Sequence, residues 1–270
     1  RRQEDDPDRA NEYLQVGYEL FENTDPAAAD SEVFAVMSEC VAHLGLRAAT
    51  GDIGILTAAV QGLDTTEARR AALMRHIWRP RRFRALLDRY AGRVPTPPAR
   101  ATLLAAEDPL AEDAPMIGLR RPSEIAARLD VLRADAAAPP ISATEVDLIE
   151  ALLDIKETLP FATTRLRDLV VDMPAIASAV EGLARRTDAM DARGLEVDTL
   201  SYEASFGRTS MEYYDGFVFG FYAPDRADLP AVASGGRYDA LTRLLGQGDE
   251  IPAVGGVIRP DLILTLEGEA

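Results

Sequence analysis

The sequence predicts an α+β fold in which a helical block is inserted into an antiparallel sheet that is flanked by helices. Two observations support this prediction. Alternating apolar and polar residues typical of strands dominate residues 1–60 and 195–270, whereas residues 61–194 form successive helical patterns between proline-rich joints. We therefore expect a core built from 1–60 and 195–270 and a helical insertion over 61–194.

The first predicted strand spans residues 12–22. Apolar residues occupy one of its faces, and the other face carries Gln15, Gly17 and Glu19. An amide and a carboxylate four residues apart on a strand lie about 13 Å from each other, here with a glycine between them. This face is either an ordinary solvent-facing surface or a place where a small ligand lies over Gly17.

A helix is expected over residues 31–46, with Asp30 as its cap and Gly45 at its end. Its apolar residues recur at helical spacing, so we expect it to pack on the core. His43 lies beside the apolar stripe without a partner at metal-ligand spacing, and we interpret it as structural. A further strand is expected to begin the segment 51–60.

The block that follows contains five clear helical patterns, at 65–78, 79–90, 121–135, 142–155 and 172–190. Its first two helices carry a cluster of arginines, namely Arg75, Arg79, Arg81, Arg82 and Arg84. The cluster is either a basic patch for phosphate or RNA or, as we favour, a set of solvated side chains on helices whose aromatic residues face the core.

Strands return at 197–206, 211–223 and 229–236, and short turns between them predict an antiparallel meander. In the second of these strands Tyr214 shares a face with two glycines, which weaken a strand unless something approaches its backbone closely. Gly235 and Gly236 then precede Tyr238 at the start of a helix. By spacing alone, this glycine pair is either a turn or the floor of a ligand site.

Composition limits the possible partners. The formal charge is −16 and the sequence contains one lysine, so we expect no nucleic-acid binding. One cysteine and two histidines give poor support for a metal site, and no cofactor motif is present. No apolar run is long enough to span a membrane, which indicates a cytoplasmic protein without a membrane partner. Because the chain starts at Arg1 without a methionine, we expect that an N-terminal portion precedes it.

The sequence lacks the phosphate loop, the nucleophile elbow and the paired-histidine zinc motif, which argues against hydrolases and metalloenzymes. What remains is a set of polar and small residues on predicted strands. If these strands are neighbours, the carboxylate and amide could take an ammonium group, while tyrosine hydroxyls and glycines admit a flat ring. The set therefore predicts a pocket of the size of an amino acid.

Several motifs resemble histidyl-tRNA synthetases. YYDGFVF, SGGRYDALTRLLG and IPAVGGVI are similar to the C-terminal half of that family's catalytic domain, in the same order. The segment RQEDDPDRANEYLQVGYELF resembles its second class II motif, with Arg2 and Glu4 at the Arg-x-Glu positions. The resemblance covers about residues 1–60 and 195–266, and it implies a class II aminoacyl-tRNA synthetase-like antiparallel sheet.

The departures from that family concern its chemistry. Leu262 stands where the third motif has a phosphate-binding arginine, and Thr209 stands where an arginine helps to activate histidine, with Arg208 one place away. The chain also ends at Ala270, where a synthetase continues into an anticodon-binding domain. These features resemble the ATP phosphoribosyltransferase regulatory subunits, which are synthetase paralogues of histidine biosynthesis without aminoacylation activity.

That second resemblance implies a non-catalytic chain that assembles with a short-form ATP phosphoribosyltransferase catalytic subunit. It implies a dimer of this chain within a hetero-octamer, and histidine as a feedback effector that acts by allostery. Either this chain or the catalytic partner would hold the histidine. Two alternatives stay open: a histidyl-tRNA synthetase catalytic core, or a synthetase-like sensor of an amino acid.

By the same resemblance, the histidine site consists of Gln15, Glu19, Tyr214, Gly235, Gly236 and Tyr238. Gln15 and Glu19 would hold the ammonium group, and the tyrosines would lie near the imidazole over a glycine floor. Arg2, Glu4 and Arg208 would be vestigial parts of the synthetase motifs.

Overall fold

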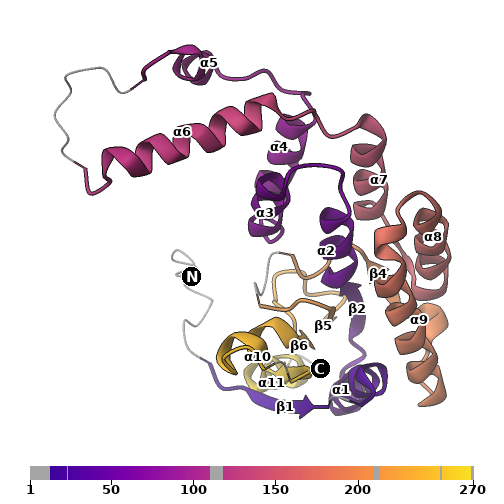
Figure 1. The fold of residues 1–270 in the computed structure, drawn as a ribbon. Helices are drawn as coiled ribbons and strands as arrows, with labels where there is room; N and C mark the ends of the chain where they lie inside the picture. Colours follow the sequence, from indigo (N-terminus) through magenta and orange to yellow (C-terminus); the bar gives the residue numbers. More distant parts are fainter. Residues whose placement is uncertain (1–12, 23, 110–117, 209–212, 250, 269–270) are drawn as a thin grey trace. The chain divides into compact units, whose positions relative to one another are not determined.

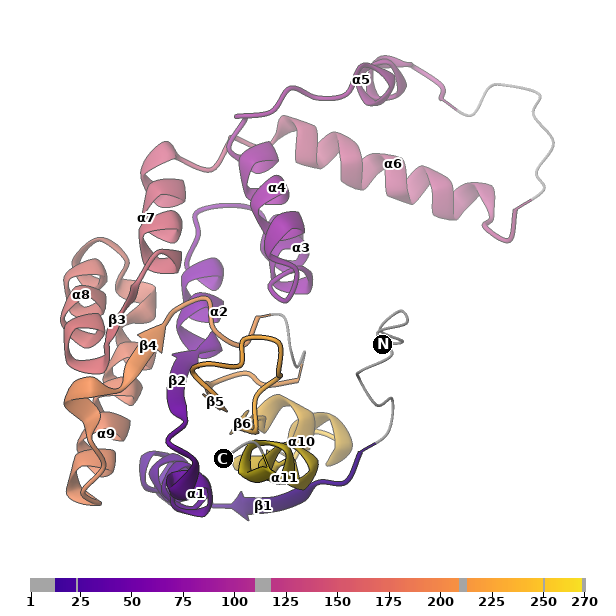
Figure 2. The same ribbon diagram turned by 180° about the vertical axis from the view of Figure 1, so that it is seen from behind.

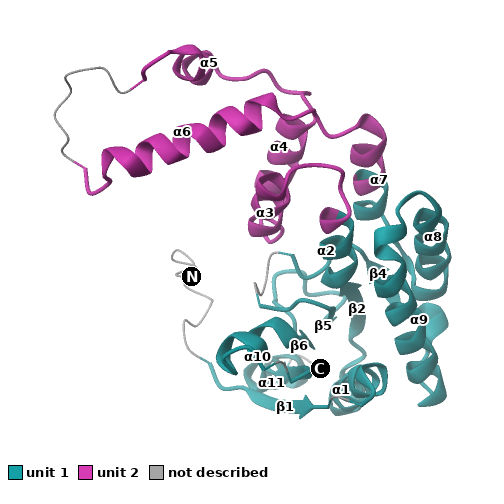
Figure 3. Ribbon diagram, in the orientation of Figure 1, with its two compact units in different colours: residues 1–59, 150–270 teal, residues 60–149 magenta. Residues whose placement is uncertain are grey.

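The computed structural model describes residues 13–22, 24–109, 118–208, 213–249 and 251–268 (Figure 1). They divide into two compact units (Figure 3). Unit 1 comprises residues 1–59 and 150–270, and unit 2 comprises residues 60–149. The predicted α+β class, an antiparallel sheet flanked by helices, is confirmed in unit 1.

Unit 1 is built on a seven-stranded sheet with the order β1-β7-β6-β5-β2-β4-β3. The strands are β1 (Val16–Phe21), β2 (Arg47–Asp52), β3 (Lys156–Thr158), β4 (Ser201–Glu203), β5 (Phe217–Tyr222), β6 (Ala233–Arg237) and β7 (Ala253–Ile258). All neighbouring strands are antiparallel except β2 and β4. The predicted meander is therefore correct for β5 and β6 and wrong for β4, because β2 lies between β4 and β5.

Helices surround the sheet and fill unit 2. Those of unit 1 are α1 (Pro26–Val41), α8 (Leu159–Asp172), α9 (Ala177–Ala192), α10 (Asp239–Leu245) and α11 (Pro260–Gly268), with the short helices η1 (Ala42–Leu44), η2 (Pro174–Ile176) and η3 (Val197–Thr199). Unit 2 contains α3 (Glu67–Arg75), α4 (Pro80–Tyr90), α5 (Pro98–Ala105) and α6 (Pro122–Ala137). The unit boundaries fall within α2 (Ile53–Gln61) and α7 (Ala143–Leu153). Among the described residues, none of these helices is long and apolar enough to cross a membrane.

The core of unit 1 lies between the sheet and α1. Phe34 on α1 contacts three aromatic rings of β5, those of Phe217, Phe219 and Phe221, with ring centroids 5.3–6.1 Å apart. Alternate residues of a strand point to opposite faces, so these rings define the α1 face of the sheet. The intervening residues of β5, among them Val218 and Gly220, belong to the other face, which we call the site face.

Helix α1 begins earlier than the sequence predicts. Asp25 caps it by accepting a hydrogen bond from the amide of Ala28 at 3.0 Å, and Pro26 occupies its first turn, where proline is well tolerated. Asp30, the expected cap, is buried inside the helix and pairs with Arg186 and Arg237. Asp30 resembled a helix cap because it is a polar residue that precedes an apolar run. Its true partners, Arg186 and Arg237, lie far away in the sequence.

The insertion ends earlier than the predicted position 194. Helices α8 and α9 belong to unit 1, where α9 lies beside α1 in both views of the fold (Figures 1 and 2). Val180 and Leu183 of α9 are buried there, and Arg186 contributes to the ion pairs of Asp30. The proline-rich joints marked helix ends correctly, but they carried no information on which unit each helix joins.

Unit 2 has its own small core, which includes Phe83 and Leu87 of α4 and Leu129 of α6. The buried Arg69 ties α3 to α6 through Asp135, with a nitrogen–oxygen distance of 2.7 Å, and it donates to the carbonyl oxygen of Pro139 as well. All five arginines of the cluster at 75–84 are exposed.

Candidate functional site

Strand register brings one row of residues together on the site face. Glu19 on β1 lies opposite Gly255 on β7, which lies opposite Gly236 on β6. Gly236 in turn lies opposite Val218 on β5, and Val218 lies opposite Gly51 on β2. The row therefore runs from a carboxylate at the edge strand across a floor of glycines to the centre of the sheet.

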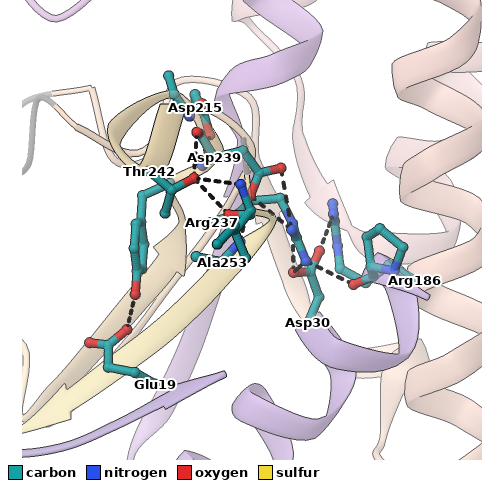
Figure 4. Close-up of polar contacts among 12 residues, drawn as sticks. Glu19, Asp30, Arg186, Asp215, Arg237, Asp239, Thr242 and Ala253 are labelled. Atoms are coloured by element: carbon teal, nitrogen blue, oxygen red, sulfur yellow. Dashed lines mark hydrogen bonds and ion pairs between the residues drawn. The ribbon is translucent and has the colours of Figure 1, made fainter. Parts of the chain in front are cut away.

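The Glu19 carboxylate lies directly over this floor. The hydroxyl of Tyr238 donates a short hydrogen bond to Oε2 of Glu19 (Figure 4). A Cβ atom at Gly255 would overlap the Glu19 carboxylate, so only glycine leaves room for this arrangement. Burial and the neighbouring Glu19 carboxylate raise the pKa of Tyr238 above its ordinary value, so its hydroxyl stays protonated and donates at neutral pH.

Two further tyrosines complete the cluster. Tyr214 is 5% exposed, and its ring covers Gly236, where a Cβ atom would overlap it. The ring of Tyr213 lies 4.5 Å from that of Tyr214 and meets Tyr238 edge-on at 6.1 Å, measured between centroids. The pKa of Tyr214 is also raised, mainly by burial and to a smaller extent by its hydrogen bond with Tyr213, so the phenol stays neutral. We call Glu19, Tyr213, Tyr214 and Tyr238 the tyrosine–glutamate cluster.

The structure brings four of the six predicted site residues together, namely Glu19, Tyr214, Gly236 and Tyr238. Gly235 belongs to the α1 face instead, where a Cβ atom would overlap the Phe219 ring and the Gly255 carbonyl oxygen. The two neighbouring glycines thus serve different faces, as the alternation of a strand requires.

Gln15 lies before the start of β1 and outside the cluster. Its amide donates to the hydroxyl of Tyr13 at 3.3 Å, and the guanidinium of Arg259 lies 3.8 Å from the centroid of the Tyr13 ring. Gln15 therefore contacts Tyr13, whose ring lies against the guanidinium of Arg259.

Of the predicted vestigial residues, the structure describes only Arg208. Arg208 is buried, and it follows Gly207, whose backbone lies against Val218 of the row described above. Arg2, Glu4 and Thr209 lie outside the described residues. Leu262, predicted to stand where synthetases have an arginine, is 6% exposed and belongs to the hydrophobic core through α11.

Sequence reasoning missed Tyr213 and Gly255. Tyr213 precedes β5, so strand alternation did not assign it to the face of Tyr214. Gly255 lies in the glycine-rich run 252–258, and only the pairing of β7 with β1 reveals that it accommodates Glu19.

The cluster is suited to binding. An exposed carboxylate beside neutral tyrosine hydroxyls attracts an ammonium group, and the glycines of the floor let the Glu19 carboxylate and the Tyr214 ring lie close to the sheet backbone. Phenols with raised pKa values are poor bases at neutral pH, and the cluster has no serine, cysteine or histidine as a nucleophile. In the described part of the chain, no three His, Cys, Asp or Glu side chains gather as a metal site.

Comparisons with known proteins concern the fold and the family. The family model described as histidyl-tRNA synthetase matches residues 1–121 and 122–263. The fold is similar to a Bacillus halodurans structure titled ATP phosphoribosyltransferase regulatory subunit/histidyl-tRNA synthetase, with a TM-score of 0.60, 20% identity and coverage of 94% of this chain and 53% of that one. A histidyl-tRNA synthetase from Nostoc gives a TM-score of 0.59, 16% identity and coverage of 94% and 50%. The chain thus spans about half the length of these two structures.

Fold and family model together define the class: a histidyl-tRNA synthetase-like protein built on the class II synthetase sheet. Two curated relatives identify the family within this class. The ATP phosphoribosyltransferase regulatory subunits of Brucella anthropi and Brucella ovis are 30% and 31% identical, and each match covers 97% of this chain and 74% of the relative. The chain belongs to the family of ATP phosphoribosyltransferase regulatory subunits.

Proposed function

We propose that this chain is a non-catalytic regulatory subunit of ATP phosphoribosyltransferase. It acts with a short-form catalytic subunit in the first step of histidine biosynthesis, in the cytoplasm. The observation that carries the proposal is its similarity over 97% of its length to proteins named as such regulatory subunits. The assembly we propose is a hetero-octamer in which the regulatory chains dimerise.

The proposal extends to a ligand, histidine, at the tyrosine–glutamate cluster. Glu19 would accept hydrogen bonds from the ammonium group of the amino acid, and the hydroxyls of Tyr214 and Tyr238 would lie near the imidazole. Glu19 and Tyr238 share a hydrogen bond, and the ring of Tyr213 contacts those of both Tyr214 and Tyr238, which supports a common site. Feedback then follows if histidine binds one state of the assembly more tightly than another, because only differential affinity shifts an equilibrium.

The absence of aminoacylation is part of the same proposal. A synthetase must bind the phosphates of ATP, and the position where the family has an arginine for this purpose is occupied here by the buried Leu262. A buried leucine contributes no charge to a phosphate. We expect no histidine-dependent exchange of pyrophosphate into ATP; exchange at a synthetase-like rate would identify a catalytic core instead.

The decisive test of function is the rate at which a short-form catalytic subunit transfers the phosphoribosyl group to ATP, with and without this protein. We expect this protein to raise that rate and to co-elute with the catalytic subunit in gel filtration. An unchanged rate and separate elution would point to a sensor of a different system.

A further inference from the structure

A buried group of alternating charges lies on the α1 face of the sheet, behind the tyrosine–glutamate cluster (Figure 4). Asp30 of α1 is bound by two arginines: Arg237 of β6 donates to Oδ1 at 2.7 and 3.0 Å, and Arg186 of α9 donates to Oδ2 at 3.1 Å. Arg186 also donates to Asp52 at the end of β2, at 2.6 Å. Arg186 and Arg237 are 5% and 8% exposed, so the group is almost completely removed from water.

The two residues that flank Tyr238 both belong to this group. Arg237, directly before it, donates to both carboxylate oxygens of Asp239, directly after it, at 3.0 and 3.3 Å. Arg237 also donates to the carbonyl oxygen of Pro26 at 3.0 Å. One guanidinium therefore fixes the chain on both sides of the tyrosine and anchors it to α1.

Asp239 extends the same connection toward the glycine floor. It accepts a hydrogen bond at 2.8 Å from the amide of Ala253, two residues before Gly255 on β7. Asp215, the residue after Tyr214, accepts from the amides of Asp239 and Ala240 at the start of α10. Asp215 and Asp239, which Figure 4 labels, thus connect the backbone next to Tyr214 with the backbone next to Tyr238.

Burial makes this arrangement stiff. A buried ion pair costs desolvation, and removing one partner leaves a charge without compensation in the interior. The side chains therefore have few alternatives to the observed contacts. Because Arg237 has to donate to Asp30, Asp239 and Pro26 at once, only a planar guanidinium with several donors fits its position.

We propose that Arg237 and Asp239 are positioning residues: their ion pair, anchored on Asp30, clamps the chain on both sides of Tyr238 and sets its contact with Glu19 on the opposite face. This inference rests on the proposed function in one respect, the identity of histidine as the ligand. The clamp consists of side chains of this chain alone, so hydrogen exchange can measure it without histidine.

The test compares Arg237→Met, Arg237→Lys and Asp239→Asn with the wild type, all as the full chain. The matched control is Arg69→Met, because Arg69 is an equally buried arginine that pairs with an aspartate in unit 2. Three measurements are made on each protein: amide hydrogen exchange by mass spectrometry without histidine, the affinity for histidine by calorimetry, and the free energy of unfolding in urea.

We expect Arg237→Met and Asp239→Asn to accelerate exchange at least tenfold over 238–242, where the amide of Tyr238 bonds to the Ala253 carbonyl oxygen. Histidine affinity should fall at least tenfold. Arg237→Lys should recover part of the stability toward urea but not the affinity, since an ammonium group cannot reach all three acceptors. Arg69→Met should lose stability and leave both the exchange of 238–242 and the affinity unchanged.

Wild-type exchange over 238–242 in both Arg237→Met and Asp239→Asn would overturn the clamp. If one of them fails to fold, the other decides. If the wild type itself gives no heat with histidine, the proposed ligand is wrong, and the exchange measurements still decide on the clamp. Equal losses of affinity in Arg69→Met and Arg237→Met would also overturn it, because the effect would then be a general result of destabilisation.

Discussion

Gly255→Ala separates the role of the glycine floor in binding from its role in folding. A methyl group at this position would overlap the Glu19 carboxylate, to which its three nearest atoms all belong. The carboxylate belongs to an exposed side chain that can rotate away. Glu19 would therefore move, and its contact with Tyr238 would be lost.

The two consequences differ in size. Replacing a strand glycine by alanine stabilises a protein by about 0.5–1 kcal/mol, which roughly offsets the loss of one partly exposed hydrogen bond of about 1 kcal/mol. The free energy of unfolding should hence change by less than about 1 kcal/mol. A hydrogen bond to a charged group contributes about 1.5–3 kcal/mol to binding, so displacing Glu19 should weaken histidine binding about 10- to 150-fold.

The control is Gly235→Ala on β6. Gly235 directly precedes Gly236, the floor glycine that lies opposite Gly255. Its methyl group would overlap a backbone carbonyl oxygen and the Phe219 ring on the α1 face, neither of which can rotate away. Overpacking of this kind costs about 1–3 kcal/mol. Gly235→Ala should therefore lose stability, whereas Gly255→Ala should lose affinity.

Urea unfolding and calorimetric titration with histidine, on both variants, measure the two quantities. Wild-type affinity in Gly255→Ala would refute the reasoning, because the observed position of Glu19 would then be irrelevant to the ligand. A stability loss in Gly255→Ala as large as that in Gly235→Ala would refute the assignment of the two glycines to different faces.

Three further predictions concern single side chains. The hydroxyl of Tyr202 is buried without a hydrogen-bond partner among the described residues, so Tyr202→Phe should raise the free energy of unfolding by about 1 kcal/mol in urea titrations; a loss would indicate a bound partner. Leu262→Ala should lower it by about 2–5 kcal/mol, and a neutral result would contradict the burial of this side chain. Glu19→Gln should lower the pKa of Tyr238 toward 10.0, and absorbance titration against a Tyr238→Phe control detects the change. In the wild type, the free energy of unfolding should fall as the pH rises above 10, since the folded state retains the Tyr238 proton to higher pH than the unfolded state.

Sequence reasoning succeeded where chemistry is local. The alternation in residues 12–22 correctly placed Glu19 on a strand face with Gly17, and apolar periodicity with proline-rich joints correctly indicated α3, α4, α6, α7 and α9. It did not indicate α5 or α8. The resemblance of YYDGFVF, SGGRYDALTRLLG and IPAVGGVI to histidyl-tRNA synthetases correctly indicated the fold and the family.

It failed where partners are distant. Asp30 looked like a helix cap because Arg186 and Arg237, its partners, are separated from it by 156 and 207 residues. Gly235 and Gly236 looked equivalent until strand pairing placed Gly236 opposite Gly255. Gln15 was expected on the same strand face as Glu19, and the contact that its side chain makes with Tyr13 could not be predicted from spacing.

The contrast has a physical origin. Periodicity reports which face a residue occupies within its own element, whereas the site depends on the register of β1, β7, β6 and β5 with one another. Register is fixed by packing between segments far apart in the chain, and no single segment contains that information.

The most direct test of the whole account is the inhibition by histidine of ATP phosphoribosylation in the complex reconstituted from this protein and a short-form catalytic subunit. The wild type and Glu19→Gln are compared, each relative to its own rate without histidine. We predict that the histidine concentration for half-inhibition rises at least tenfold in Glu19→Gln. Identical inhibition curves for the two complexes would contradict the account, because histidine would then act at a site other than the tyrosine–glutamate cluster.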